Sequence, residues 1–250
     1  MPNSKTDFLS YGPNPKARLR LFCFPYAGSG ASNFYPWTKG LPAEIQVCPV
    51  QLPGRENRLT VPPFTRLFPL VKDLAQALLP YLDVPFAFFG HSMGALVSFE
   101  LARELRRHHE FGLAHLFVSA CRAPQIPDPA QPLHQLSESS FVKEICRRYN
   151  GIPAAVLQSE ELMKLFLPVL KADMEIIETY VYTDEEPLDC AISAFGGLWD
   201  HETSRDDLAA WRVLTRSTFD LRMLQGDHFF LQSNRVVILQ AVCRDLMQHL

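Results

Sequence analysis

The chain has 250 residues, of which 47% are hydrophobic and 20% charged, a composition that fits a globular protein and excludes a disordered or fibrous one. Its formal net charge of -3 gives no general attraction for nucleic acid, and no apolar run reaches the ~20 residues that a membrane span needs. The six cysteines lack a CxxC pair, so we expect neither a zinc site nor a disulfide framework. Residues 1–7 lack the apolar core of a signal peptide, which favours a cytoplasmic protein.

Apolar, β-leaning runs recur along the chain with helical patterns between several of them. They cover residues 19–24, 46–50, 86–89, 116–120, 190–195 and 221–224. This alternation predicts an α/β fold with a mostly parallel central sheet flanked by helices. We expect a single domain over residues 1–250, with its chemistry at the carboxyl ends of the strands.

The third apolar run leads into a motif that points to catalysis. Gly90-His91-Ser92-Met93-Gly94 fits G-x-S-x-G, and an amphipathic helical pattern follows it. In that pattern a sharp strand-to-helix turn lifts the serine clear of the sheet, and glycines allow the strand and the helix to approach closely. The sequence therefore predicts that Ser92 is a nucleophile.

A serine nucleophile also needs two backbone N–H donors for the oxyanion that it creates. Met93, the residue after the serine, supplies the first. The glycine-rich turn at residues 24–30, directly after the first apolar run, supplies the second. We assign this donor to Ala27, with Tyr26 as the alternative.

A long connection separates the fourth apolar run from the fifth. A proline-rich stretch at 123–129 precedes two helical patterns, one that ends at Asn150-Gly151 and one that opens after Ser159 and contains Pro168. We expect Pro168 to bend the second helix. We interpret residues 122–185 as a helical lid inserted into the domain, while two ordinary crossover helices remain the alternative.

The base and the acid should follow later strands, because α/β-hydrolases place serine, acid and histidine in that chain order. His228 lies in the loop after the run at 221–224, whereas His91 sits inside the elbow, where it cannot easily reach Ser92. Asp200 closes the Gly-Gly loop after the run at 190–195. Asp184 and Asp189 remain alternatives for the acid, and Asp206 and Asp207 are typical helix-starting residues.

Several stretches together resemble one family, the type II (editing) thioesterases of nonribosomal peptide and polyketide synthase pathways, which have the α/β-hydrolase fold. They are "FPYAGSGAS" (24–32), "QLPGRENR" (51–58), "GHSMGALVSFELAREL" (90–105) and "LQGDHFFL" (224–231), with "LPVLKADMEIIETYVY" (167–182) similar to the lid helix and "FGGLWD" (195–200) to the acid loop. The resemblance supports Ser92, Asp200 and His228 as the triad, and Ala27 and Met93 as the oxyanion donors. Asp227 departs from the glycine that is common in the family.

The resemblance implies hydrolysis of acyl groups from the phosphopantetheine thiol of acyl or peptidyl carrier proteins, which removes stalled or misprimed chains. We expect a monomer with no cofactor of its own and no metal. Apolar faces in the lid region could line an acyl channel, at Phe141, Ile145, Leu162 and Phe166. Arg55 and Arg58 are expected at the surface, either solvated or in contact with an acidic carrier.

Other functions remain open on sequence grounds, because the same triad hydrolyses oxygen esters and amides. A medium-chain fatty acyl thioesterase and a small-molecule carboxylesterase are the alternatives within enzymes. A non-catalytic binding protein on a hydrolase scaffold is the alternative from another class.

Overall fold

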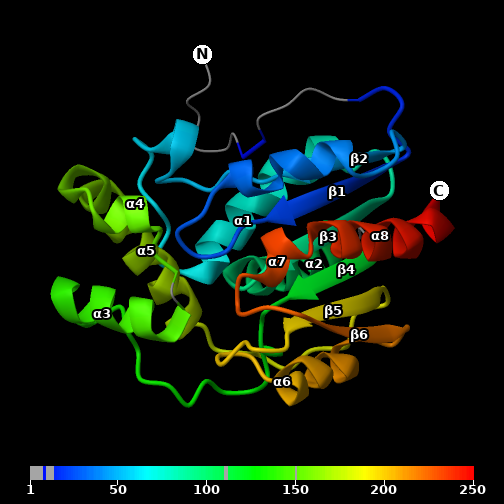
Figure 1. Cartoon of the computed structure of the whole chain (residues 1–250). Coiled ribbons are helices and arrows are strands. Elements are labelled where there is room, and N and C mark those ends of the chain that lie inside the picture. The colour runs from blue at the N-terminus through cyan, green and yellow to red at the C-terminus, as the bar shows by residue number, and fades with distance from the viewer. Residues whose placement is uncertain (1–7, 10–13, 110–111, 150) are drawn as a thin grey trace.

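Six parallel strands form one central sheet, in the order β2-β1-β3-β4-β5-β6 (Figure 1). The computed structural model describes residues 8–9, 14–109, 112–149 and 151–250. The strands are β1 (Leu19–Phe24), β2 (Ile45–Pro49), β3 (Phe86–His91), β4 (His115–Ser119), β5 (Ala191–Gly197) and β6 (Phe219–Leu224). Each overlaps one of the six apolar runs, so the predicted α/β fold with a mostly parallel sheet is confirmed.

Helices cover both faces of this sheet. The α-helices are α1 (Leu67–Leu78), α2 (Met93–His109), α3 (Glu138–Tyr149), α4 (Ala154–Leu157), α5 (Glu160–Glu178), α6 (Arg205–Ala209), α7 (Phe230–Ser233) and α8 (Arg235–Leu246). The 3-10 helices are η1 (Ala31–Lys39), η2 (Glu56–Arg58), η3 (Leu79–Tyr81), η4 (Ala210–Leu214) and η5 (Met247–His249). Within the described ranges, none of the helices is long and apolar enough to cross a lipid bilayer.

Alternate residues of each strand feed two separate cores, because successive side chains of a strand point to opposite faces. Phe22 and Phe88 pack against α1 and α2 on one face. Leu21 and Phe89 pack against η1 and α8 on the other. All four of these side chains are fully buried, which explains why β1 and β3 appear in the sequence as mostly apolar runs.

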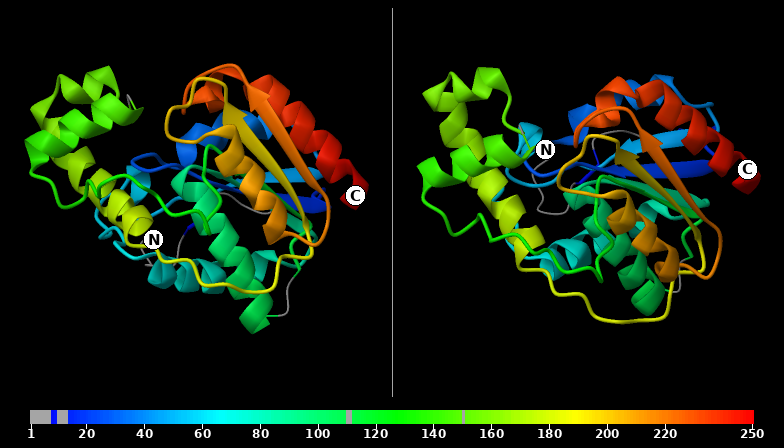
Figure 2. Two further views of the ribbon diagram at one scale, coloured as in Figure 1. Left: turned by 90° about the horizontal axis from the view of Figure 1, so that it is seen from below. Right: turned by 60° about the horizontal axis from the view of Figure 1, so that its bottom comes forward.

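The segment between β4 and β5 carries α3, α4 and α5, which lie beyond the carboxyl ends of the strands (Figures 1 and 2). It has a small core of its own, which includes Phe141 and Ile145. As predicted, α3 ends at Tyr149, and α5 begins after Ser159, whose hydroxyl accepts a hydrogen bond from the Leu162 N–H at 3.3 Å. The short helix α4 is not evident from the sequence.

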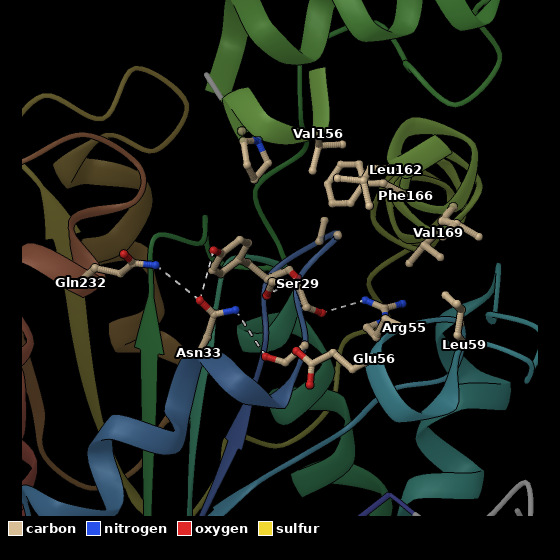
Figure 3. Close-up of a pocket in the computed structure, with 18 residues that line it drawn as sticks. Ser29, Asn33, Arg55, Glu56, Leu59, Val156, Leu162, Phe166, Val169 and Gln232 are labelled. Atoms are coloured by element: carbon tan, nitrogen blue, oxygen red, sulfur yellow. Dashed lines mark hydrogen bonds between the residues drawn. The ribbon is translucent and has the colours of Figure 1, made fainter. Parts of the chain in front are cut away.

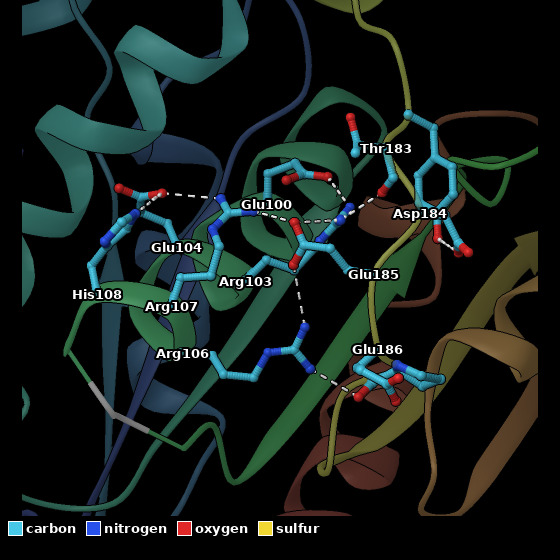
Figure 4. Close-up of polar contacts among 12 residues, drawn as sticks. Glu100, Arg103, Glu104, Arg106, Arg107, His108, Thr183, Asp184, Glu185 and Glu186 are labelled. Atoms are coloured by element: carbon cyan, nitrogen blue, oxygen red, sulfur yellow. Dashed lines mark hydrogen bonds and ion pairs between the residues drawn. The ribbon is translucent and has the colours of Figure 1, made fainter.

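An ion-pair cluster holds the end of this segment against α2. Residues 183–187 lie along the helix, and Glu185 pairs with Arg103 at 2.7 Å, with Arg106 at 3.4 Å and with Arg107 (Figure 4). Arg103 also donates to the carbonyl of Thr183 at 2.6 Å. The chain that leaves α5 is therefore fastened to the main body of the molecule before it enters β5.

Candidate active site

Ser92 occupies a strained turn between β3 and α2. Its φ of 52° is rare for a residue with a side chain, and its N–H donates to the Ser119 carbonyl of the neighbouring strand at 2.7 Å. A Cβ on Gly90 would overlap the backbone of Gly94, and a Cβ on Gly94 would overlap the carbonyl of Phe24. Both glycines are therefore needed for the close approach of strand and helix that presents the Ser92 hydroxyl.

Two loops from later strands bring a histidine and a carboxylate to this hydroxyl. His228 Nε2 lies 3.1 Å from Ser92 Oγ, and His228 Nδ1 lies 2.8 Å from Asp200 Oδ2. With Nδ1–H donating to the carboxylate, Nε2 is free to accept the serine proton. The three residues that the sequence singled out thus form one hydrogen-bonded chain.

The surroundings of Asp200 keep it ionised. Its side chain is buried, and burial alone would raise its pKa, but the hydrogen bond and charge of His228 lower the pKa below its usual value. The N–H groups of Glu202 and Thr203 donate to Oδ1 at 2.9 and 3.2 Å and act in the same direction.

The other candidate acids have other partners. Asp184 accepts from the Tyr182 hydroxyl at 3.3 Å, and Asp189 is largely exposed, with Arg216 as its partner at 3.8 Å. Asp207 completes a capping box with Ser204 at the start of α6, as expected for a helix-starting acid. Asp227 accepts from the Phe229 N–H at 2.9 Å and so stabilises the turn that carries His228.

His91 holds the loop that carries His228, a role that the sequence did not predict. It is fully buried, with Nε2 3.0 Å from the carbonyl oxygen of His228 and Nδ1 2.8 Å from the hydroxyl of Ser119. Burial and the nearby His228 lower the pKa of His91 to about 3, so its ring is neutral and Nε2–H donates to His228. The motif position of His91 gave no sign that its ring reaches the histidine loop.

Both residues predicted to donate to the oxyanion line cavities that Ser92 also lines. Met93 is the first residue of α2, so its N–H has no intrahelical partner. Ala27 lines a narrow cavity that also includes Ser92 and His228, and Tyr26 lines it as well. The amide of Gly28 is engaged elsewhere, since it donates to Asp173 Oδ2 at 2.7 Å.

Asp173 ties α5 to the loops of the main body. It forms two hydrogen bonds with Arg55, from Nη1 to Oδ2 at 2.6 Å and from Nη2 to Oδ1 at 2.8 Å, and both side chains are buried. Arg58 is also buried, over the ring of Phe8. The expectation that Arg55 and Arg58 lie at the surface is therefore wrong, because partners distant in sequence cover both guanidinium groups.

A cleft of about 560 Å³ opens onto Ser92, Met93 and His228. Its walls come from residues 120–132, the end of α5 and the loop that carries Glu202 and Thr203. Among the residues that the structure describes, no group of three or more His, Cys, Asp or Glu side chains is placed to hold a metal ion.

Comparisons with known proteins give the family. The model of the thioesterase domain matches residues 19–249. The gramicidin S biosynthesis protein GrsT of Aneurinibacillus migulanus is 46% identical over 239 residues, which cover 96% of this chain and 93% of the relative.

Solved structures agree with this relationship. The RedJ thioesterase of the prodiginine pathway in Streptomyces coelicolor is 39% identical, with a TM-score of 0.86 over 92% of this chain and 91% of its own. The type II thioesterase BorB of the borrelidin cluster is 31% identical, with a TM-score of 0.85 over 98% of both chains. The chain therefore belongs to the thioesterase family, as a hydrolase with the α/β-hydrolase fold whose relatives are type II thioesterases of nonribosomal peptide and polyketide pathways.

Proposed function

We propose that this protein hydrolyses acyl thioesters with Ser92 as nucleophile, His228 as general base and acid, and Asp200 as the orienting carboxylate. The observation that carries the proposal is the chain from Ser92 Oγ through His228 to Asp200, with distances of 3.1 and 2.8 Å. Each link is a hydrogen bond of ordinary length, as the proton transfers require. No cofactor is needed for this chemistry.

The reaction runs in two halves. His228 Nε2 takes the Ser92 proton while Oγ attacks the thioester carbonyl, and the Ala27 and Met93 amides stabilise the oxyanion. Collapse breaks the carbon–sulfur bond, and the sulfur leaves as a thiol with the proton from His228. Water then attacks the acyl-serine with His228 as base, which releases the carboxylic acid and restores Ser92.

We propose carrier proteins as the source of the acyl groups, and removal of stalled or misprimed chains as the purpose. The support is the family, since relatives act in gramicidin S, prodiginine and borrelidin biosynthesis by their names. In this proposal the protein works as a monomer in the cytoplasm, where carrier proteins are loaded. Residues 122–185, inserted into one domain of 250 residues, act as the lid over the site.

The test is mass spectrometry of acyl-loaded carrier proteins incubated with the parent protein and with Ser92→Ala. We expect the parent to return the free phosphopantetheine thiol, and the variant to leave the acyl mass unchanged. Simple oxygen esters of the same acyl groups serve as the comparison. Faster hydrolysis of those esters than of the carrier thioesters would favour a carboxylesterase, and binding without turnover by the parent would favour a non-catalytic protein.

A further inference from the structure

Ala27, the proposed oxyanion donor of the loop after β1, lies in a β-turn over residues 26–29. The Ser29 N–H donates to the Tyr26 carbonyl at 3.0 Å, and the Ser29 hydroxyl donates to the same oxygen at 2.9 Å. Gly28, at the third position, has a φ of 76°, a left-handed value that favours glycine there. Because the peptide bond between Tyr26 and Ala27 is trans, the Ala27 N–H points away from the Tyr26 carbonyl and out of the turn.

Two charged side chains hold this turn from outside. Asp173 of α5 accepts a hydrogen bond from the Gly28 N–H at 2.7 Å, through Oδ2. Arg55 donates from Nη1 to the Ser29 carbonyl at 3.1 Å (Figure 3). The two peptide groups that follow Ala27 in the chain are thus each fixed by a charge-assisted hydrogen bond.

The two side chains also fix each other. Arg55 donates from Nη1 to Asp173 Oδ2 at 2.6 Å and from Nη2 to Oδ1 at 2.8 Å, so Oδ2 serves Arg55 and Gly28 at once. Arg55 Nε donates to the Pro53 carbonyl at 3.1 Å, which sets the plane of the guanidinium group. Arg55 is 6% and Asp173 1% exposed, so water does not compete for these bonds.

Helix α5 also packs directly on the turn. A Cβ on Gly28 would lie 2.9 Å from Phe166 Cζ and 3.1 Å from Leu170 Cδ1. The turn therefore has no room to shift toward the helix, and Asp173 prevents it from moving away. Any displacement of this part of α5 displaces the turn as well.

The Ala27 N–H itself is left for a substrate. Within the part of the chain that the structure describes, no group accepts a hydrogen bond from it. Ala27 lines a narrow cavity together with Ser92 and His228. An oxyanion donor acts only when it is fixed at the right distance, and a misplacement of about 1 Å in an active site can cost about 10²-fold in rate.

We propose that Asp173, together with Arg55, is a positioning residue for the reaction, which holds the turn so that the Ala27 amide faces the oxyanion. This inference rests on the proposed function, in which Ala27 is the second oxyanion donor. The Asp173 carboxylate touches no reacting atom and acts through the Gly28 N–H. Helix α5 thereby contributes to the chemical step, because the donor is in place only while the helix lies against the turn.

Two substitutions at Asp173 separate the turn from the ion pair. Asp173→Asn and Asp173→Ala both leave Arg55 without its counter-ion, but only Asp173→Asn retains an oxygen that can accept from the Gly28 N–H. On a hexanoyl pantetheine thioester, we expect kcat to fall about 10²-fold in Asp173→Ala and about tenfold in Asp173→Asn. The KM should stay within about threefold of the parent value, because the oxyanion forms only after the substrate has bound.

Two further variants complete the series. Glu175→Gln is the matched control, since Glu175 also joins α5 to an arginine of the main body, Arg66, and should keep the kcat of the parent. Arg55→Lys leaves no buried charge unpaired, so it carries the test if Asp173→Ala does not fold. An ammonium group lacks the planar fork that reaches both carboxylate oxygens and the Ser29 carbonyl, so kcat should again fall about tenfold.

A pair of inhibitors measures the oxyanion site without turnover. Ser92 Oγ adds to the carbonyl carbon of a hexyl trifluoromethyl ketone, its proton moves to His228, and the carbonyl oxygen becomes an oxyanion. The carbinol of the same skeleton has the same shape but cannot form this adduct. We expect the ratio of the carbinol Ki to the ketone Ki to fall at least tenfold in Asp173→Ala and to be unchanged in Glu175→Gln. Partial unfolding would affect both inhibitors alike, so it would not move the ratio.

The outcomes separate this inference from the proposed function. A parent protein that binds the ketone no more tightly than the carbinol would refute the proposed nucleophile and oxyanion site. A parent that prefers the ketone, with the same kcat and the same ratio in folded Asp173→Ala or Arg55→Lys, would refute the positioning role alone.

Discussion

Asp200 uses its two oxygens for different tasks, since Oδ2 orients His228 and Oδ1 holds its own loop. In Asp200→Asn the side chain keeps its shape, but an amide nitrogen in place of Oδ2 would favour the wrong tautomer of the His228 imidazole. We expect kcat to fall by up to ~10⁴-fold with the free energy of unfolding little changed. Steady-state kinetics and urea unfolding measure the two quantities. Asp189→Asn is the matched control, and a larger loss there than at Asp200 would mean that the acid is misassigned.

His91 makes the stability of the site depend on pH. Its pKa is about 3 in the folded protein and 6.5 when unperturbed, so the unfolded chain binds the proton more tightly. The contribution of the neutral His91 to the free energy of unfolding is therefore fully present above pH 6.5. It is lost as the pH falls toward 3, at up to about 1.4 kcal/mol per pH unit. His91→Gln should unfold with a shallower dependence on pH below 6.5 than the parent does.

Urea unfolding at a series of pH values measures this difference. His115, whose pKa burial lowers to about 4, contributes in the same direction in both proteins and so does not distort the comparison. His108→Gln, at an exposed position, serves as the control and should follow the parent. Parallel curves for the parent and His91→Gln would show that His91 is not held neutral.

Among the elements, α5 is attached to the main body by the buried Arg55–Asp173 pair. Removal of one partner leaves a buried charge without compensation, so Asp173→Ala should cost about 3 kcal/mol or more. Arg55→Ala should cost a similar amount, and the double variant less than the sum of the two. Chemical denaturation of the four proteins gives the coupling.

An exposed pair on the same helix is the control for this cycle. Lys164 and Glu160 lie 2.7 Å apart with both side chains largely in water, so their cycle should show almost no coupling. Additive losses at Arg55 and Asp173 would mean that the pair does not attach the helix.

The Arg55–Asp173 pair also divides the proposed lid into two parts, which we expect to differ in mobility. Leu170, Asp173, Met174 and Ile176 are buried in the second half of α5, whereas the apolar side chains exposed on α4 and the first half of α5 include Leu157, Leu162 and Leu165. Amide exchange should therefore be slow in the second half of α5 and faster in α4 and the first half.

Hydrogen exchange with and without a non-hydrolysable acyl-pantetheine thioether measures this mobility in the free and in the ligand-bound protein. The ligand should slow exchange in α4 and the first half of α5, and leave the second half unchanged. Uniformly slow exchange across α3 to α5, unaffected by the ligand, would mean that the segment does not gate the site.

For the molecule as a whole, the sheet and the meeting of Ser92, Asp200 and His228 could be predicted from sequence, because both follow from local pattern and chain order. The six strands are mostly apolar runs, and the carboxyl ends of the parallel strands β3, β5 and β6 place Ser92, Asp200 and His228 at one edge of the sheet. The turn geometry at Ser92 was predictable because only glycine fits at positions 90 and 94.

The supporting contacts could not be predicted, because they join segments whose proximity appears only after folding. Arg55 and Asp173 are 118 positions apart. The sequence alone indicates a surface guanidinium for Arg55, whereas α5 covers it in the folded chain. The ring of His91 meets the backbone of His228 across 137 positions. Neither contact has a spacing or residue pattern that marks it in the chain.

The cooperation of Ser92 and His228 is tested most directly by kinetics of Ser92→Ala, His228→Ala and the double variant on one acyl-carrier thioester. Because the two residues act as a unit, we expect each single variant to lose about 10⁶-fold in kcat, and the double variant to lose no more than either single one. Losses that multiply in the double variant, or turnover near that of the parent in Ser92→Ala, would contradict a hydrolysis carried out by this triad.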